Sequence, residues 1–208
     1  MKRWFLRIAL YVVGLFFLAF GVSLSIKSGL GVSPVSSVPL VLGYVTGIEI
    51  GNMTIIIFCF YVIVQIVLLK KQFRWVNLLQ IVCAVLFGKF VTLTCSILIG
   101  WNPTVYFERL LMVLGSTVVI ALGMKLYLST GIIPQAADGL VQTVSDKYGF
   151  ALSNVKNCFD ILSVLFSVSL SLIMTGKMIG IREGTVITAL GVGRVLAGLN
   201  YFLKNVHD

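Results

Sequence analysis

The chain has 208 residues, of which 59% are hydrophobic and 11% are charged, and its mean hydropathy is +1.06. A soluble domain carries roughly 45–50% apolar and 25% charged residues, so the composition excludes a soluble globular protein and indicates a membrane protein. The 16 Lys and Arg exceed the 7 Asp and Glu by 9. We interpret this excess as flanking charge that fixes membrane topology, and we expect no nucleic-acid partner.

Two stretches without charge, Ile8–Ile26 and Ile50–Leu69, are 19 and 20 residues long, and about 20 apolar residues cross a bilayer. The hydrophobic pattern predicts an all-α polytopic membrane protein with six transmembrane helices. Six spans of about 21 residues use about 126 of the 208 residues, so we expect no large extramembrane domain. The six predicted spans are residues 5–27, 51–70, 75–99, 106–128, 153–175 and 184–203.

Few side chains are available to bind a metal or a cofactor, and we expect neither. The single His is His207. The four Cys stand alone in apolar segments, where isolated thiols behave as small apolar residues, and they are Cys59, Cys83, Cys95 and Cys158. Zinc and haem sites need clustered ligands.

The connections 28–50 and 129–152 are too long to be simple loops. In the first, Ser33 and Pro34 have the order of an N-cap and a first helical residue, and Pro134 begins the corresponding segment of the second. We predict a short Pro-initiated helix in each, at 33–46 and 134–148. Each is either re-entrant or interfacial; if both instead span the membrane, the count becomes eight.

The two halves of the chain repeat. Residues 14–60 align with residues 116–162 at a constant offset of 102, and the aligned identities include three Gly pairs and the pair Asn52 and Asn154. At an offset of 105, Gly88-Lys89 aligns with Gly193-Arg194. We therefore divide the chain into a first membrane repeat, 1–101, and a second, 102–208. Three spans in each repeat predict opposite orientations, as in many secondary transporters.

The positive-inside rule orients this arrangement. Lys and Arg lie before the first span or in its first turn, between the second and third spans, and between the fourth and fifth. They are Lys2, Arg3, Arg7, Lys70, Lys71, Arg74 and Lys147. We therefore expect a multi-pass membrane protein with both termini in the cytoplasm and residues 100–105 outside.

Charges inside the spans are costly, at roughly 2.5–3.5 kcal/mol each at a helix centre, and often face a cavity or a partner. Lys89 and Arg194 lie near the middle of their spans. Lys156 and Asp160 are four residues apart and share one helix face. Asp138 falls in the first turns of the second short helix, where the helix dipole favours a carboxylate.

Two interpretations of these charges are open. In the first, Lys89, Arg194 and the starts of the two short helices line a cavity for a small anionic or zwitterionic solute. In the second, Lys89 and Arg194 form salt bridges with Asp160 and Asp138 and leave no charge for a ligand. Asn52 and Asn154 are further candidate ligands, with interhelical hydrogen bonding as their alternative role.

The Gly and Pro pattern resembles that of the YczE/YyaS/YitT-like integral membrane proteins of bacteria. The resemblance rests on Ser28-Gly29-Leu30-Gly31-x-x-Pro34, Thr46-Gly47-x-x-x-Gly51, Gly131-x-x-Pro134-x-x-x-Asp138 and Gly184-Thr185. It covers nearly the whole chain, although the Gly that usually precedes the second Pro is absent. The resemblance implies a small, multi-pass protein of the bacterial cytoplasmic membrane, and it adds Thr185 to the candidate site.

Two classes of function follow. The first is a secondary transporter or permease, or a substrate-capturing membrane subunit, that binds its solute near the midplane between the repeats. The second is a non-transporting scaffold or regulatory partner of another complex. We do not expect an enzyme, because no nucleophile and base have the necessary spacing. A chain of this size is expected to need a second copy or a partner membrane protein to enclose a cavity.

Overall fold

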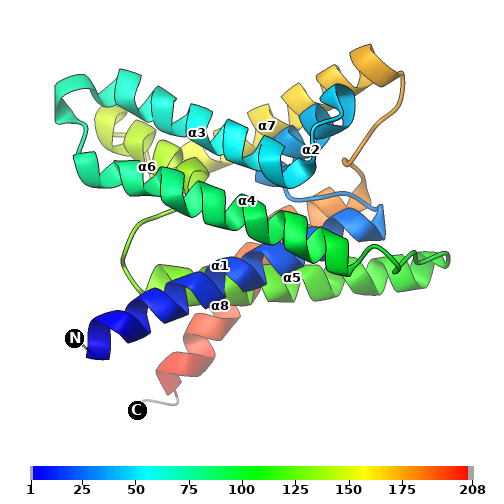
Figure 1. Cartoon of the computed structure of the whole chain (residues 1–208), viewed down its shortest axis with the longest axis horizontal. Helices are drawn as coiled ribbons and strands as arrows, with labels where there is room; N and C mark the ends of the chain where they lie inside the picture. Colours follow the sequence, from blue (N-terminus) through cyan, green and yellow to red (C-terminus); the bar gives the residue numbers. More distant parts are fainter. Residues whose placement is uncertain (1, 206–208) are drawn as a thin grey trace. The chain divides into compact units, whose positions relative to one another are not determined.

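In the computed structural model, the backbone is described for residues 2–205 and the side chains for residues 4–199 and 201; His207 and the side chains of Lys2 and Arg3 lie outside this description. All the regular structure in the described part is helical (Figure 1). The α-helices are α1 (Lys2–Ser28), α2 (Pro34–Thr46), α3 (Ile50–Leu69), α4 (Leu79–Ile97), α5 (Tyr106–Ser129), α6 (Ala136–Tyr148), α7 (Leu152–Thr175) and α8 (Glu183–Asn205), and the short 3-10 helices η1 (Lys70–Gln72) and η2 (Trp75–Leu78) connect α3 to α4.

Five of the described helices are long and apolar enough to cross a membrane, by length and composition. They coincide with the first five predicted spans and are Trp4–Ser28, Ile50–Gln72, Trp75–Ile97, Tyr106–Ser129 and Leu152–Thr175. The sixth predicted span forms a helix, α8, but this helix is not among the five. It contains Glu183 and Arg194, which lower its mean hydropathy.

The two short helices lie where the Pro residues predict them. Helix α2 begins at Pro34, as expected for a Pro at the first helical position, and it tolerates a second, buried Pro39 in its interior. Helix α6 begins at Ala136, two residues later than the Pro134 start that we predicted, and Gln135 is its N-cap. Gly149 then ends α6 in the left-handed conformation, with φ of 71°, which Gly adopts without steric cost.

The described helices form two compact units, and helix α4 belongs to both. Unit 1 contains α1, the part of α4 from Phe90 onward, α5 and α8; unit 2 contains α2, α3, the part of α4 up to Lys89, α6 and α7. Each unit therefore takes segments from both halves of the sequence. The predicted boundary between residues 101 and 102 separates two sequence repeats, whereas the two units are groups of helices in space. The repeat boundary therefore stays a prediction.

Unit 1 is built on the pair of helices α1 and α5, with α8 packed on α5 (Figure 1). Gly14 and Gly123 allow the backbones of α1 and α5 to approach closely. A Cβ atom at Gly123 would lie 2.5 Å from the Leu18 nitrogen, and one at Gly14 would lie 2.6 Å from the Tyr127 nitrogen. Small residues at helix crossings are typical of membrane bundles, where close packing replaces the hydrophobic effect.

In unit 2, both short helices, α2 and α6, pack on the same two long helices, α3 and α7. A buried amide pair holds this unit together. Gln65 of α3 donates from Nε2 to Gln80 Oε1 at 2.9 Å and to the Ala136 carbonyl at 3.2 Å, and Gln80 Nε2 donates back to Gln65 Oε1 at 3.3 Å. These bonds connect α3, α4 and the start of α6, and in a membrane they satisfy groups that water cannot reach.

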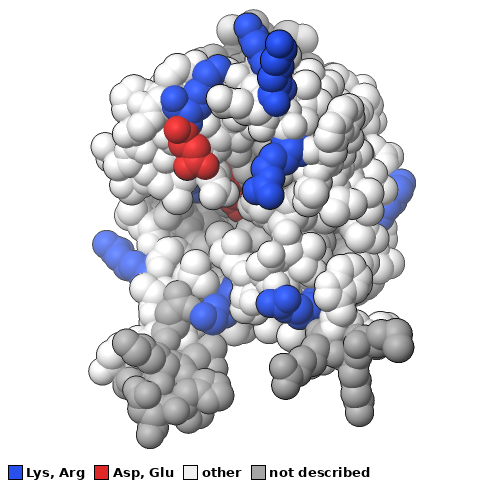
Figure 2. Space-filling model, turned by 90° about the vertical axis from the view of Figure 1, so that its left-hand side faces the viewer, with Lys and Arg blue, Asp and Glu red and all other residues white. Residues whose placement is uncertain are grey.

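Basic side chains predominate over acidic ones on the face drawn in Figure 2. In unit 2, four of the residues predicted to be cytoplasmic are exposed at the ends of α3 and α6: Lys70, Lys71, Arg74 and Lys147. Lys147 donates from Nζ to the Leu68 carbonyl at 2.6 Å. It thereby caps the C-terminal end of α3, where a cation is favoured.

Candidate functional site

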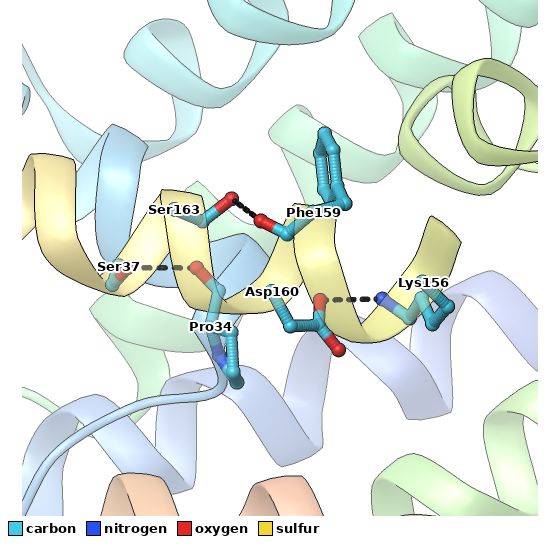
Figure 3. Close-up of polar contacts among 6 residues, drawn as sticks. All are labelled: Pro34, Ser37, Lys156, Phe159, Asp160 and Ser163. Atoms are coloured by element: carbon cyan, nitrogen blue, oxygen red, sulfur yellow. Dashed lines mark hydrogen bonds and ion pairs between the residues drawn. The ribbon is translucent and has the colours of Figure 1, made fainter. Parts of the chain in front are cut away.

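The Lys156–Asp160 ion pair is the central polar feature of unit 2. Lys156 Nζ lies 2.7 Å from Asp160 Oδ1, and the two side chains are 35% and 25% exposed. The residues are four apart on α7, so both project from the same helix face (Figure 3). Helix α7 is one of the five candidate spans, and an ion pair at such a position points to a polar environment within the span.

The first turn of α2 lies against this part of α7. Ser37 donates to the Pro34 carbonyl at 2.7 Å and shares a hydrogen bond of 2.9 Å with Ser167 of α7. Figure 3 places Pro34, at the start of α2, beside the Asp160 carboxylate. The start of α2, which is the positive end of its helix dipole, therefore lies in the same part of unit 2 as an acidic side chain.

The first turn of α6 contributes Asp138 to the same unit. Asp138 is half-buried, and its carboxylate is close enough to Asp160 to interact with it electrostatically. Pro134, also half-buried, lies just before the helix. Asp138, Lys156 and Asp160 thus bring two carboxylates and one ammonium group together near the starts of the two short helices.

Lys89 has a different environment in unit 2. Its Nζ donates to Asn52 Oδ1 at 3.3 Å, and Asn52 Nδ2 donates to Glu49 Oε2 at 3.5 Å. The two Asn identified by the repeat differ, because Asn154 is exposed in the first turn of α7 whereas Asn52 is half-buried. The salt bridge between Lys89 and Asp160 that we considered is not formed within the described residues, where Asp160 is bonded to Lys156.

Three predicted site residues belong to unit 1. Arg194 is exposed on α8, and Ser33 directly precedes α2. Thr185 is buried, and its Oγ1 accepts a hydrogen bond from the Arg182 N–H at 3.4 Å. Thr185 therefore stabilises the turn into α8, which accounts structurally for the Gly-Thr motif.

Sequence reasoning missed three buried amide side chains in unit 2: Gln65, Gln80 and Gln135. Gln65 is 1% exposed and Gln80 2% exposed. A lone Gln inside the uncharged stretch Ile50–Leu69 was the available signal, since a polar group inside a span needs a partner. Gln135 gave no comparable signal, because its position directly after Pro134 is equally compatible with an exposed loop.

Together, the five apolar helices and the polar residues between them define a multi-pass α-helical membrane protein. The chain belongs to the family of unknown function DUF6198, which matches residues 5–201. It is 30% identical over 192 residues to the uncharacterized membrane protein YczE of Bacillus subtilis (strain 168), covering 92% of this chain and 84% of YczE. It is 29% identical over 164 residues to the uncharacterized protein YyaS of the same organism, covering 75% and 79%. No solved structure matches the chain.

Proposed function

We propose that the chain is a secondary transporter, or the substrate-capturing membrane subunit of one, and that it binds a small anionic or zwitterionic solute in unit 2. The binding site is formed by the Lys156–Asp160 pair of α7 with the starts of α2 and α6. The observation that carries the proposal is the position of these charges: they lie on a candidate span, near the start of α2 (Figure 3), and Asp160 is within electrostatic range of Asp138 in the first turn of α6.

The energetics of a membrane support a ligand role for this cluster. Charges within spans are costly and are commonly tied to substrate or ion pathways, and both Lys156 and Asp160 lie within the 24 residues of α7. A structural role alone would be served as well by an apolar pair of similar volume. The partial exposure of both side chains, 35% and 25%, supports access by a solute.

The proposal includes the inverted repeat and the six-span arrangement. Helices α2 and α6 both have 13 residues, and their starts at Pro34 and Ala136 are 136 − 34 = 102 positions apart. The glycines that follow them, Gly47 and Gly149, have φ angles of 73° and 71°. These agreements at the offset found in the sequence support a duplicated unit of one long helix, one short helix and two further long helices.

Alternating access would then use the two short helices as the polar lining of a path. Their starts carry partial positive charge, and Asp160 and Lys156 supply charges of both signs. A solute with charges of its own can replace some of these interactions, which lowers the cost of leaving water. No metal, cofactor or catalytic chemistry forms part of this proposal.

The test is uptake into proteoliposomes, with a panel of small carboxylates and amino acids. We expect wild-type protein to accumulate at least one of them and Asp160→Asn to lose this uptake while remaining folded. Asp146→Asn is the matched control, because it removes an exposed acid from the other end of α6. Equal uptake by the two variants would contradict the assignment to Asp160, and absence of uptake and of thermal stabilisation across the panel would contradict the transport proposal.

The outer face of α7 supports a second candidate, a scaffold or regulatory partner of another membrane complex. Helix α7 is the least buried of the five candidate spans. Its serines Ser163, Ser167 and Ser171 are buried, whereas Leu162, Leu165 and Phe166 are exposed. A Leu165→Cys variant decides between the candidates: disulfide cross-linking to one specific protein in native membranes, without any solute uptake, would favour the scaffold.

A further inference from the structure

The start of α6 carries a buried side-chain amide, that of Gln135. Gln135, the N-cap residue, is 8% exposed, and its Nε2 has no hydrogen-bond partner among the described residues. Its side chain does not cap the helix either. Buried side-chain amides almost always have partners. An unpaired Nε2 at this position indicates that an acceptor from outside the chain completes the site.

The backbone adds donors at the same place. Ala136 and Ala137 are 1% and 2% exposed, and their N–H groups donate no hydrogen bond to any described residue. The first N–H groups of a helix have no partner within it, and at a water-exposed end the solvent satisfies them. Here they are buried beside Gln135, in a helix of 13 residues whose dipole favours a negative group at this end.

The corresponding position in the first half differs. There the start of α2 lies beside the Asp160 carboxylate of α7 (Figure 3). The residue that corresponds to Asp160 in the first repeat lies 102 positions earlier, at 160 − 102 = 58. It is Phe58 of α3, which is 3% exposed and has no charge. The long helix that packs on α6 therefore supplies no carboxylate from the equivalent place, and a ligand carboxylate would be the counterpart of Asp160 at the start of α6.

The charges nearby narrow the class of ligand. Asp138 and Asp160 interact electrostatically, and Lys156 is the ammonium group paired with Asp160. The Lys156–Asp160 pair presents a solute with one charge of each sign. A zwitterion suits this arrangement, because its ammonium group can face Asp160 while its carboxylate accepts hydrogen bonds at the start of α6.

We propose that the start of α6 is a carboxylate-binding subsite for a small zwitterionic solute of the amino-acid type. Gln135 Nε2 and the N–H groups of Ala136 and Ala137 donate to the carboxylate. This inference rests on the proposed function and narrows its substrate class. It assigns Gln135 a direct contact with the solute.

The first experiment needs no ligand. Gln135→Met removes the unpartnered amide and keeps the length of the side chain, so we expect a higher melting temperature for the ligand-free, full-length protein. Gln80→Met is the matched control: it strands the amide of Gln65 and should lower the melting temperature. If Gln135→Met lowers it as much as Gln80→Met does, Gln135 has a structural partner and the subsite is wrong.

The second experiment measures ligand-induced shifts of melting temperature. The probes are an equimolar pool of the proteinogenic L-amino acids and the same pool as C-terminal carboxamides. We expect the amino acids to raise the melting temperature of wild-type protein, the carboxamides to leave it unchanged, and Gln135→Met to respond to neither. No shift with the amino acids, an equal shift with the carboxamides, or a retained shift in Gln135→Met would overturn the proposal.

A third pool, of small carboxylic acids without an amino group, separates this inference from the proposed function. If these acids stabilise both wild-type protein and Gln135→Met but not Asp160→Asn, then a solute site at Asp160 stands. The zwitterion subsite at Gln135 fails in that case. If no pool stabilises wild-type protein and no uptake is found, both fail together.

Discussion

Lys156 and Asp160 form a neutral unit on α7, and a change to either residue alone leaves the other charge without its partner. Breaking such a pair costs more than removing both members. Lys89 is independent of this unit, because its Nζ is bonded to Asn52. The residue-scale contacts therefore define which substitutions should be coupled.

We expect Lys156→Gln and Asp160→Asn to be coupled by roughly 0.5–3 kcal/mol in a double-mutant cycle, as residues in contact usually are. The double variant should be more stable than the sum of the single changes predicts. Melting temperatures in detergent measure the effect. Lys89→Gln combined with Asp160→Asn is the control and should be additive; rescue in that combination would mean that Lys89 and Asp160 share an interaction after all.

The Gln65 and Gln80 pair gives a second residue-scale prediction. Gln65→Leu should destabilise the protein by about 1–3 kcal/mol, because it leaves the Gln80 amide and the Ala136 carbonyl buried without their donor. Replacing both Gln by Leu should cost less than the sum of the single changes. Thermal unfolding measures all three variants, and strictly additive losses would show that the two amides do not depend on each other.

These residue contacts were only partly accessible to sequence reasoning. The spacing of Lys156 and Asp160 predicted a shared helix face, and the ion pair confirms it. The partner of Lys89 was not predictable, since it depends on how α3 and α4 pack within unit 2. Hydrogen bonds that join distant parts of the sequence, such as that between Gln65 and Ala136, leave no periodic signal.

At the scale of the helix, glycine controls the distance between α1 and α5. We expect Gly123→Ala to destabilise the protein by about 1–3 kcal/mol, the usual cost of overpacking, because its Cβ would meet the Leu18 backbone. Gly115→Ala on the same helix is the control, since nothing lies within 4 Å of its Cβ. Melting temperatures in detergent test both, and equal effects would show that α1 and α5 do not cross closely at Gly123.

Helix boundaries were more predictable than side-chain contacts. Five predicted spans coincide with helices that are long and apolar enough to cross a membrane, because apolar length is a local property. The start of α6 was misplaced by two residues. Pro34 occupies the first helical position of α2, whereas Pro134 lies outside α6, and Gln135 forms the N-cap; both placements suit a residue without an N–H group.

At the scale of the whole molecule, the proposed six-span topology makes a labelling prediction. In a background without native Cys, Glu49→Cys and Asn102→Cys should react with an impermeant thiol reagent from outside, whereas Gln72→Cys and Lys147→Cys should not. All four positions are exposed. If Gln72→Cys labels from outside and Glu49→Cys does not, then α2 crosses the membrane and the repeats are parallel.

The pairing of α1 with α5 also has a consequence for biosynthesis. Ser28 ends α1 and Tyr106 begins α5, so 106 − 28 − 1 = 77 residues are made between them. At roughly 5–20 residues per second, this takes about 4–15 s. During that interval, Ser23 lacks the Thr94 hydroxyl to which it is bonded at 2.6 Å until α4 emerges, and Gly14 lacks its neighbour on α5 throughout. The insertion machinery therefore receives a first helix whose packing surface is complete only after half of the chain has been synthesised.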